Sequence, residues 1–140
     1  LHSFPTRRSS DLVPGIAGLL AGVRYVRQRG LEAICRRERQ LAQMAAEELR
    51  VLPGVTVYAR PELHAQAGVL SFTAEGREAE ALGEALAERG IAVRAGLHCA
   101  PLAHSSAGTL ESGTVRLSFS DFNTPEEVSC LVSAMREILS

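Results

Sequence analysis

The sequence predicts an α+β domain in which helices pack on a small, mostly antiparallel sheet. Two observations support this fold class. Long segments rich in Ala, Leu, Glu and Arg repeat their apolar residues at helical spacing, whereas short segments alternate apolar and polar side chains as half-buried strands do. The chain has 140 residues, of which 46% are hydrophobic, so it is long enough for one domain with its own core.

The helical segments have recognisable beginnings and ends. The last is the best defined, because Thr124-Pro125-Glu126-Glu127 combines an N-cap threonine, a proline at the first helical position and a glutamate three residues after the cap. Gly30, Pro53-Gly54 and Gly90 are stop signals for the others. We expect four helices, at about 14–28, 31–52, 78–89 and from 125 onward.

The strand candidates lie between the second and the last helix. Alternating apolar residues indicate strands at 55–59, 68–73, 91–94 and from 114 to 118 or 119. Residues 95–113 carry no clear periodicity, and we expect a loop of about nineteen residues there. A loop of this length is uncommon inside a compact domain and is often functional.

Composition excludes several classes of function. The net charge of −1 does not favour nucleic acid or an anionic membrane surface, and no apolar run approaches the ~20 residues that span a bilayer. All 15 basic residues are arginine, so this chain cannot supply the lysine amine of a Schiff base. Three cysteines without regular spacing favour a reducing compartment over a disulfide framework.

The first twelve residues, LHSFPTRRSSDL, differ from the Ala/Gly/Val-rich sequence that follows them. They show no helical or strand periodicity. We interpret residues 1–12 as a non-native segment that resembles the translation of a sequencing adapter, and the alternative is a disordered N-terminal arm. On either interpretation they are left out of the fold prediction.

The predicted loop carries the candidate chemistry. It contains His98 and Cys99, and it is flanked by Arg94 on one strand and Arg116 on another. An arginine can hold a carboxylate with two parallel hydrogen bonds. A thiol beside a histidine and near two arginines would have its thiolate favoured. The pattern therefore suits a nucleophilic or redox-active thiol next to an anion site.

Each of these residues also has a purely structural interpretation. Cys99 is equally compatible with a small buried hydrophobic residue, and we expect Cys35 and Cys130 to be structural residues of their helices. The two arginines could be ordinary solvated charges. A zinc site at His98, Cys99 and His104 is disfavoured, because adjacent ligands are poorly spaced and a fourth is missing; we predict no metal site.

Three segments together resemble a known family: VPGIAGLLAGV (13–23), GIAVRAGLHCAPLAH (90–104) and GTVRLSFSDFNTPEEV (113–128). They are similar to the C-terminal part of cysteine desulfurases, within the class V aminotransferase group of enzymes that use pyridoxal 5′-phosphate (PLP). The most specific marker is the Arg-x-Gly-x-His-Cys-Ala pattern that begins at Arg94. The resemblance implies the small C-terminal domain of a fold type I PLP-dependent transferase.

The resemblance also implies roles for the site residues. Cys99 would attack the sulfur of L-cysteine, so that alanine is released and a persulfide remains on the enzyme. Arg116 would hold the substrate carboxylate, Arg94 would shape that site, and His98 would lie at the site without an assigned role. The PLP lysine and the other cofactor contacts would belong to a large domain that is missing from this sequence.

The same resemblance implies a domain assignment and partners. Residues 13–30 would be the end of the missing PLP-binding domain, and residues 31–140 the small domain that carries the cysteine loop. The whole enzyme would be a cytoplasmic homodimer that passes sulfur to an acceptor protein for iron–sulfur cluster or thio-cofactor assembly. The 140-residue chain alone would not turn over substrate.

Two alternatives remain at this point. Leu97 stands where many of these desulfurases have a second histidine, and the stretch between Cys99 and Arg116 is longer than in typical members. The enzyme could therefore be another PLP lyase of the same fold, acting on selenocysteine or on a cysteine conjugate. The alternative from a different class is a cofactor-free domain that binds carboxylates or senses oxidants through Cys99.

Overall fold

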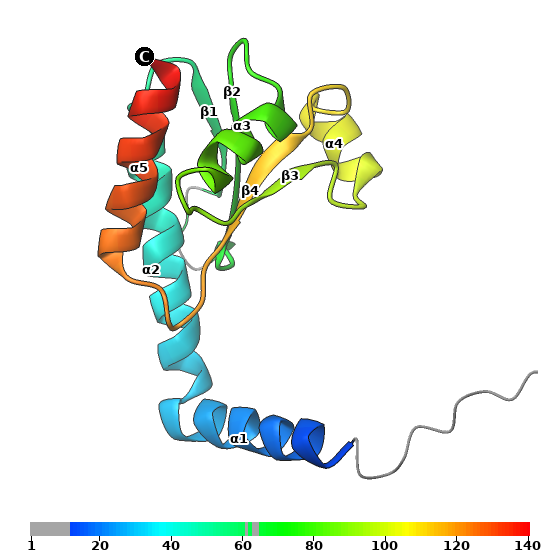
Figure 1. Cartoon of the computed structure of the whole chain (residues 1–140), viewed down its shortest axis with the longest axis vertical. Coiled ribbons are helices and arrows are strands. Elements are labelled where there is room, and N and C mark those ends of the chain that lie inside the picture. Colours follow the sequence, from blue (N-terminus) through cyan, green and yellow to red (C-terminus); the bar gives the residue numbers. More distant parts are fainter. Residues whose placement is uncertain (1–11, 61, 63–64) are drawn as a thin grey trace, which may run out of the picture. The chain divides into compact units, whose positions relative to one another are not determined.

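The structure, a computed structural model, describes residues 12–60, 62 and 65–140 (Figure 1). The predicted non-native segment therefore lies, except for Leu12, outside the described residues. The chain divides into two compact units, one that ends at Ile34 and one that comprises Cys35–Ser140. No helix in the described part of the chain has both the length and the apolarity that a membrane crossing needs.

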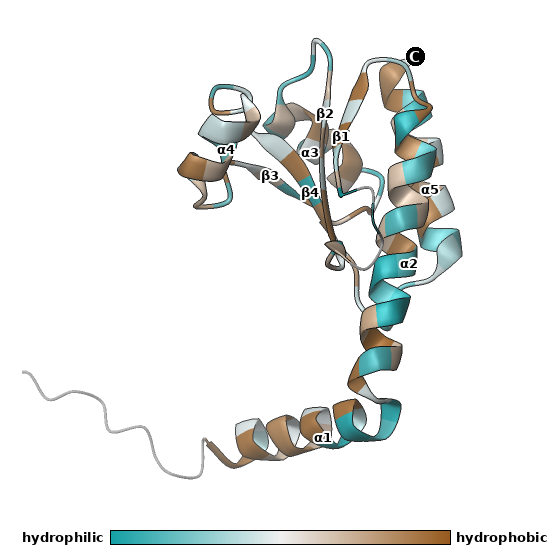
Figure 2. Ribbon diagram, turned by 180° about the vertical axis from the view of Figure 1, so that it is seen from behind, coloured by the Kyte–Doolittle hydropathy of each residue, from teal (hydrophilic) through white to brown (hydrophobic). Residues whose placement is uncertain are grey.

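Helix α1 (Val13–Arg29) lies in the first unit and confirms the first predicted helix. Pro14 occupies its first turn, where a missing backbone N–H costs nothing, and Gly30 ends it with a φ of 85°. No residue of this helix is buried, although much of its length is apolar (Figure 2). Ile16, Leu19 and Val23 are among its exposed apolar side chains.

The second unit is a four-stranded sheet with three helices packed over one face. Every pair of neighbouring strands is antiparallel, and the strand order is β1-β2-β4-β3, which confirms the predicted fold class. The core helices are α2 (Leu31–Arg50), α3 (Ala79–Ala87) and α5 (Pro125–Leu139). The strands are β1 (Val55–Tyr58), β2 (Val69–Ala74), β3 (Arg94–Gly96) and β4 (Thr114–Ser118).

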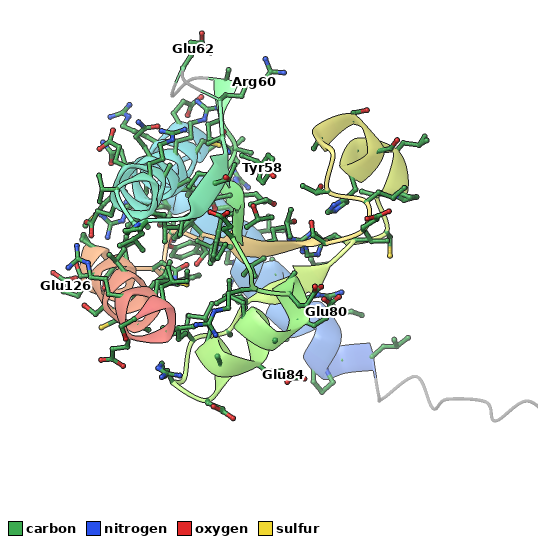
Figure 3. All side chains as sticks on the ribbon, turned by 90° about the horizontal axis from the view of Figure 1, so that it is seen from above. Tyr58, Arg60, Glu62, Glu80, Glu84 and Glu126 are labelled. Carbon is green, nitrogen blue, oxygen red and sulfur yellow. The ribbon has the colours of Figure 1, made fainter. Side chains whose placement is uncertain are left out.

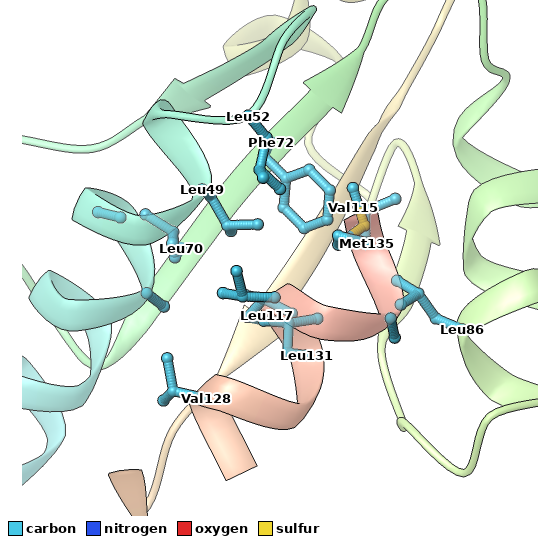
Figure 4. Close-up of a cluster of buried hydrophobic side chains, with 14 of the residues drawn as sticks. Leu49, Leu52, Leu70, Phe72, Leu86, Val115, Leu117, Val128, Leu131 and Met135 are labelled. Atoms are coloured by element: carbon cyan, nitrogen blue, oxygen red, sulfur yellow. The ribbon is translucent and has the colours of Figure 1, made fainter. Parts of the chain in front are cut away.

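The core lies between these helices and one face of the sheet (Figure 4). Phe72 of β2 is fully buried at its centre, together with Val115 of β4 and Met135 of α5. Removal of large apolar side chains such as these from water is the main term that holds the unit together. The predicted inward faces of the helices are confirmed, because Leu49 and Leu86 are also fully buried.

Two expectations for the middle of the chain are wrong. The strand predicted at 91–94 begins only at Arg94, because β4 pairs with residues 94–96 and not with those before them. Ile91 and Val93 do alternate inward and pack against the core, but side-chain alternation without a hydrogen-bonded partner is not a strand.

The long loop predicted at 95–113 is also wrong in part. Its first residues complete β3, and residues Pro101–Ala107 form a short helix, α4. The helix begins at a proline and ends before Gly108, which has a φ of 69°. In Figure 1 it stands apart from α2 and α5, beyond the ends of β3 and β4.

The capping box at the start of α5 is confirmed in detail. The Glu127 backbone N–H donates to Thr124 Oγ1 at 3.3 Å, and the Thr124 N–H donates to Glu127 Oε2 at 3.0 Å. Asn123 Nδ2 donates to the same carboxylate at 2.8 Å, and these hydrogen bonds lower the pKa of Glu127. The turn is joined to α2, because Arg37 Nη2 donates to the Asn123 carbonyl at 2.9 Å.

We expect Thr124→Ala to lower the free energy of unfolding by about 1 kcal/mol, because one helical N–H loses its partner. The measurement is urea denaturation of the 140-residue chain, followed by circular dichroism. Thr124→Ser keeps the accepting oxygen and should remain close to the wild type. Equal loss in both variants would show that the methyl group, and not the cap, is responsible.

Candidate active site

A row of polar residues crosses all four strands on the face of the sheet that points away from the core. The register pairs Tyr58 with Ser71, Ser71 with Arg116, and Arg116 with Arg94. Since side chains alternate along a strand, these four lie opposite the buried face that carries Phe72. Tyr58, the residue of this row that lies on β1, is labelled in Figure 3.

Arg94 and Arg116 are therefore cross-strand neighbours, and this pairing is the central feature of the site. Like charges directly opposite each other on a sheet destabilise it. Within the described residues neither guanidinium forms an ion pair with a carboxylate, and Arg116 Nε is buried without a hydrogen-bond partner. Two adjacent positive groups with a free buried donor are suited to a bound carboxylate.

Cys99 lies in a tight turn that follows β3. The Ala100 backbone N–H donates to the Leu97 carbonyl at 2.9 Å, and the two residues between them, His98 and Cys99, have φ values of 52° and 59°. These are the φ values of a type I′ turn, which Gly and Asn normally occupy. Such a backbone costs of order 1–3 kcal/mol for each non-glycine residue. The turn leaves the Cys99 side chain exposed.

The ring of His98 points back to the sheet. Its Nε2 lies 3.1 Å from the Thr114 carbonyl oxygen and 3.3 Å from Thr114 Oγ1. Because a carbonyl oxygen can only accept, Nε2 carries the proton. Burial of the ring, followed by the charge of Arg116, lowers the pKa of His98 below its ordinary value, which favours the neutral ring.

His98 and Arg116 present complementary free atoms. In the neutral ring Nδ1 keeps a lone pair, and it is buried without a partner, as is the Nε–H of Arg116. One atom accepts and the other donates. Buried polar atoms are almost always paired in folded proteins, so the exceptions within the described residues indicate where a ligand would bind.

The structure thus brings together three of the four predicted site residues. Arg94 and Arg116 share one face of the sheet, and the His98 ring lies at Thr114 of β4, where the charges of both arginines act on it. No hydrogen bond within the described part of the chain joins the Cys99 thiol to any of the three. Cys35 and Cys130, which we expect to be structural, lie in α2 and α5 with exposed side chains. No group of potential metal ligands is found among the described residues.

The sequence did not predict the two residues that bring together the ends of the segment from Gly96 to Gly113, which carries Cys99 and is called the Cys99 segment below. A Cβ on Gly113 would lie 2.9 Å from Gly96 Cα, and the two glycines have φ values of 63° and 100°. Only glycine permits this close approach of the two backbones. The signal that could have revealed the segment's structure is the pair Pro101 and Gly108, a start and a stop for a short helix.

Comparison with known proteins places the chain in a family. The family model described as "Aminotransferase class-V" matches residues 1–131. A probable cysteine desulfurase of Mycolicibacterium paratuberculosis is 42% identical over 121 residues, and a cysteine desulfurase of Synechococcus elongatus is 44% identical over 121 residues. Each alignment covers 86% of this chain, but only 17% and 19% of the respective relative.

Solved structures agree with these relatives. A cysteine desulfurase from Thermococcus onnurineus has a TM-score of 0.81 at 37% identity, over 86% of this chain and 30% of that one. The cysteine desulfurase CsdA from Escherichia coli has a TM-score of 0.79 at 30% identity, over 98% of this chain and 31% of that one. This chain spans less than a third of either enzyme and belongs to the class V aminotransferase family.

Proposed function

We propose that this chain is the small domain of a PLP-dependent cysteine desulfurase, which converts L-cysteine to L-alanine and leaves a persulfide on Cys99. The observation that carries the proposal is an exposed Cys99 in a positive-φ turn, directly after the strand on which Arg94 faces Arg116. An amino-acid substrate has a carboxylate for the arginines, and cysteine also has a sulfur for the thiol. The relatives named as cysteine desulfurases support this choice.

Substrate binding falls to the arginines in this proposal. The Arg116 guanidinium donates to the substrate carboxylate, and its buried Nε–H supplies a donor that no residue of the described chain uses. Arg94 stands beside it on β3 and completes the positive site. The ring of His98 is held on Thr114 of β4, and burial and the charge of Arg116 lower its pKa, which favours the neutral form.

The role of Cys99 is nucleophilic. Its thiolate attacks the sulfur of L-cysteine, an S–S bond forms, and the bond between that sulfur and the substrate Cβ breaks. The electron pair stays with carbon, which takes up a proton and becomes the methyl group of alanine. Cysteine and the thiol together contain every atom of alanine and the persulfide, so the reaction needs no external oxidant.

The residues present do not fit PLP as a covalently held cofactor, because the chain contains no lysine. We propose that PLP is held by a large domain outside this sequence, of which 13–30 would be the last part. The 140-residue chain alone is then inactive. We further propose that the whole enzyme is a cytoplasmic homodimer that delivers sulfur to an acceptor protein for iron–sulfur cluster or thio-cofactor assembly.

The test is to locate the transferred sulfur in the whole enzyme that contains this segment. After incubation with L-cysteine and digestion, mass spectrometry should find the Cys99 peptide heavier by one sulfur atom, and dithiothreitol should reverse the change. The peptides of Cys35 and Cys130, which are also exposed, serve as internal controls and should not change.

The outcomes separate the candidate substrates. Sulfur that appears on another cysteine would contradict the assignment of Cys99. Faster turnover of selenocysteine or of a cysteine conjugate than of L-cysteine would favour the related lyases instead. An enzyme that forms neither alanine nor persulfide would refute the proposed function.

A further inference from the structure

Helix α4 contains one buried residue, and that residue is polar. His104 is 6% exposed, while every other residue of Pro101–Ala107 is exposed. The helix adds nothing to the hydrophobic core cluster. A buried histidine in an otherwise solvated helix has to be explained by what its ring contacts.

The ring of His104 forms hydrogen bonds with Thr109, which follows α4 in the Cys99 segment. Its Nδ1 lies 2.8 Å from Thr109 Oγ1 and 3.2 Å from the Thr109 carbonyl oxygen. In return, the Thr109 backbone N–H donates to the His104 carbonyl at 2.9 Å. Thr109 is itself 3% exposed, so this pair of residues forms a small buried polar cluster under α4.

The His104–Thr109 cluster contacts residues at both ends of the Cys99 segment. The Gly113 N–H donates to the Thr109 carbonyl at 2.9 Å, and Gly113 packs directly on the backbone of Gly96 at the end of β3. On the other side, the ring of His104 packs on the ring of His98, with centroids 5.9 Å apart and planes tilted by 43°. His104 therefore contacts the first residue of the Cys99 turn that has a positive φ.

A strained turn persists only where its surroundings enforce the conformation. The turn's own hydrogen bond, from Ala100 to Leu97, does not require positive φ at two non-glycine residues, because the common type I turn forms the same bond. The contacts that hold His98 in place are Thr114 on β4 and the ring of His104. Of these two contacts, Thr114 belongs to the sheet, whereas His104 belongs to the Cys99 segment.

We propose that His104 is a positioning residue for Cys99: bonded to Thr109 and packed on His98, it holds the turn that presents the thiol. The inference rests on the proposed function for its catalytic consequence. The claim that His104 holds the turn concerns the 140-residue chain alone, and a separate experiment tests it. His104 acts through His98 and the turn, and its side-chain hydrogen bonds within the described residues go to Thr109, not to the arginines that are assigned to the carboxylate.

The first experiment measures the turn in the 140-residue chain. The Cα and Cβ chemical shifts of His98 and Cys99 report on positive φ and do not depend on activity. His104→Phe keeps an aromatic ring but removes Nδ1, whereas His104→Asn keeps a polar atom near the Nδ1 position but loses the ring that packs on His98. Thr109→Val removes the shorter hydrogen bond with almost no change of volume, and Thr109→Ser retains it.

We expect His104→Phe, His104→Asn and Thr109→Val to move these shifts toward those of ordinary negative-φ residues, while Thr109→Ser stays near the wild type. The urea midpoint should change little, because neither residue belongs to the core cluster. Wild-type shifts in both His104→Phe and Thr109→Val would overturn the proposal. So would a global loss of folding in Thr109→Val, because it would assign Thr109 a role in overall stability.

The second experiment measures turnover by the whole enzyme, normalised to its bound cofactor. Displacement of a reacting group by about 1 Å costs up to about 10²-fold in rate. We expect kcat for alanine formation to fall at least about tenfold in His104→Phe, with KM for L-cysteine unchanged because the arginines lie on the sheet. Thr109→Ser should restore the wild-type kcat, and Thr109→Val should not.

A KM that rises in step with the loss of kcat, or an unchanged kcat, would overturn the positioning role. Failure of the proposed function has a different signature. In that case the wild-type enzyme forms no alanine from L-cysteine, and the chemical shifts of the 140-residue chain still decide whether His104 holds the turn.

Discussion

Replacement of Cys99 by alanine in the whole enzyme is expected to abolish alanine and persulfide formation from L-cysteine, with a loss of roughly 10³-fold or more. The reason is chemical, because without the thiolate nothing accepts the substrate sulfur. The visible absorbance of bound PLP should be unchanged, since Cys99 is exposed on a turn of the small domain and the chain contains no residue that binds the cofactor covalently.

The matched controls for this prediction are the other two cysteines. Cys35→Ala and Cys130→Ala remove thiols that are also exposed, from helices α2 and α5, and both variants should retain wild-type turnover. Cys99→Ser should be as inactive as Cys99→Ala, because a hydroxyl cannot form the persulfide. Alanine formation that survives in both Cys99 variants would refute the nucleophile assignment.

The second large effect is expected at Arg116. Arg116→Gln should lower kcat/KM for L-cysteine by about 30-fold or more, since a charge-assisted pair to the carboxylate is worth roughly 2–5 kcal/mol when one partner is removed. Arg116→Lys should recover only part of this, because an ammonium group cannot reproduce the planar fork. Arg89→Gln, which breaks an exposed ion pair to Glu137 at 3.4 Å, is the control and should have no effect.

Cysteamine has the thiol and amine of cysteine but no carboxylate. It therefore tests whether Arg116 acts by binding the substrate carboxylate. If Arg116 holds the carboxylate, the wild-type enzyme should discriminate strongly against cysteamine, and Arg116→Gln should lose that discrimination. A variant that loses activity on both compounds equally would point to a structural role. Urea denaturation of the variants checks that their fold is retained, because Arg116 is half-buried in β4.

Much of the fold followed from local patterns. The capping box at Thr124 and the apolar stripe of α5 predicted that helix closely, because caps and 3.6-residue spacing act within one or two turns of chain. The start of β3 was misplaced, because pairing with β4 is a long-range interaction that alternation at Ile91 and Val93 cannot reveal. Helix α4 was missed because a helix of 7 residues leaves little periodic signal.

By itself, the sequence determined which reactive groups these 140 residues contain: one cysteine in an Arg-x-Gly-x-His-Cys-Ala pattern, a downstream arginine and no lysine. Only the tertiary structure decided how they are arranged. Register placed Arg94 opposite Arg116, and positive φ values exposed Cys99. The buried His104 contacts the turn that carries that thiol. Side-chain identity is local information, whereas register, backbone strain and burial depend on contacts between residues distant in the chain.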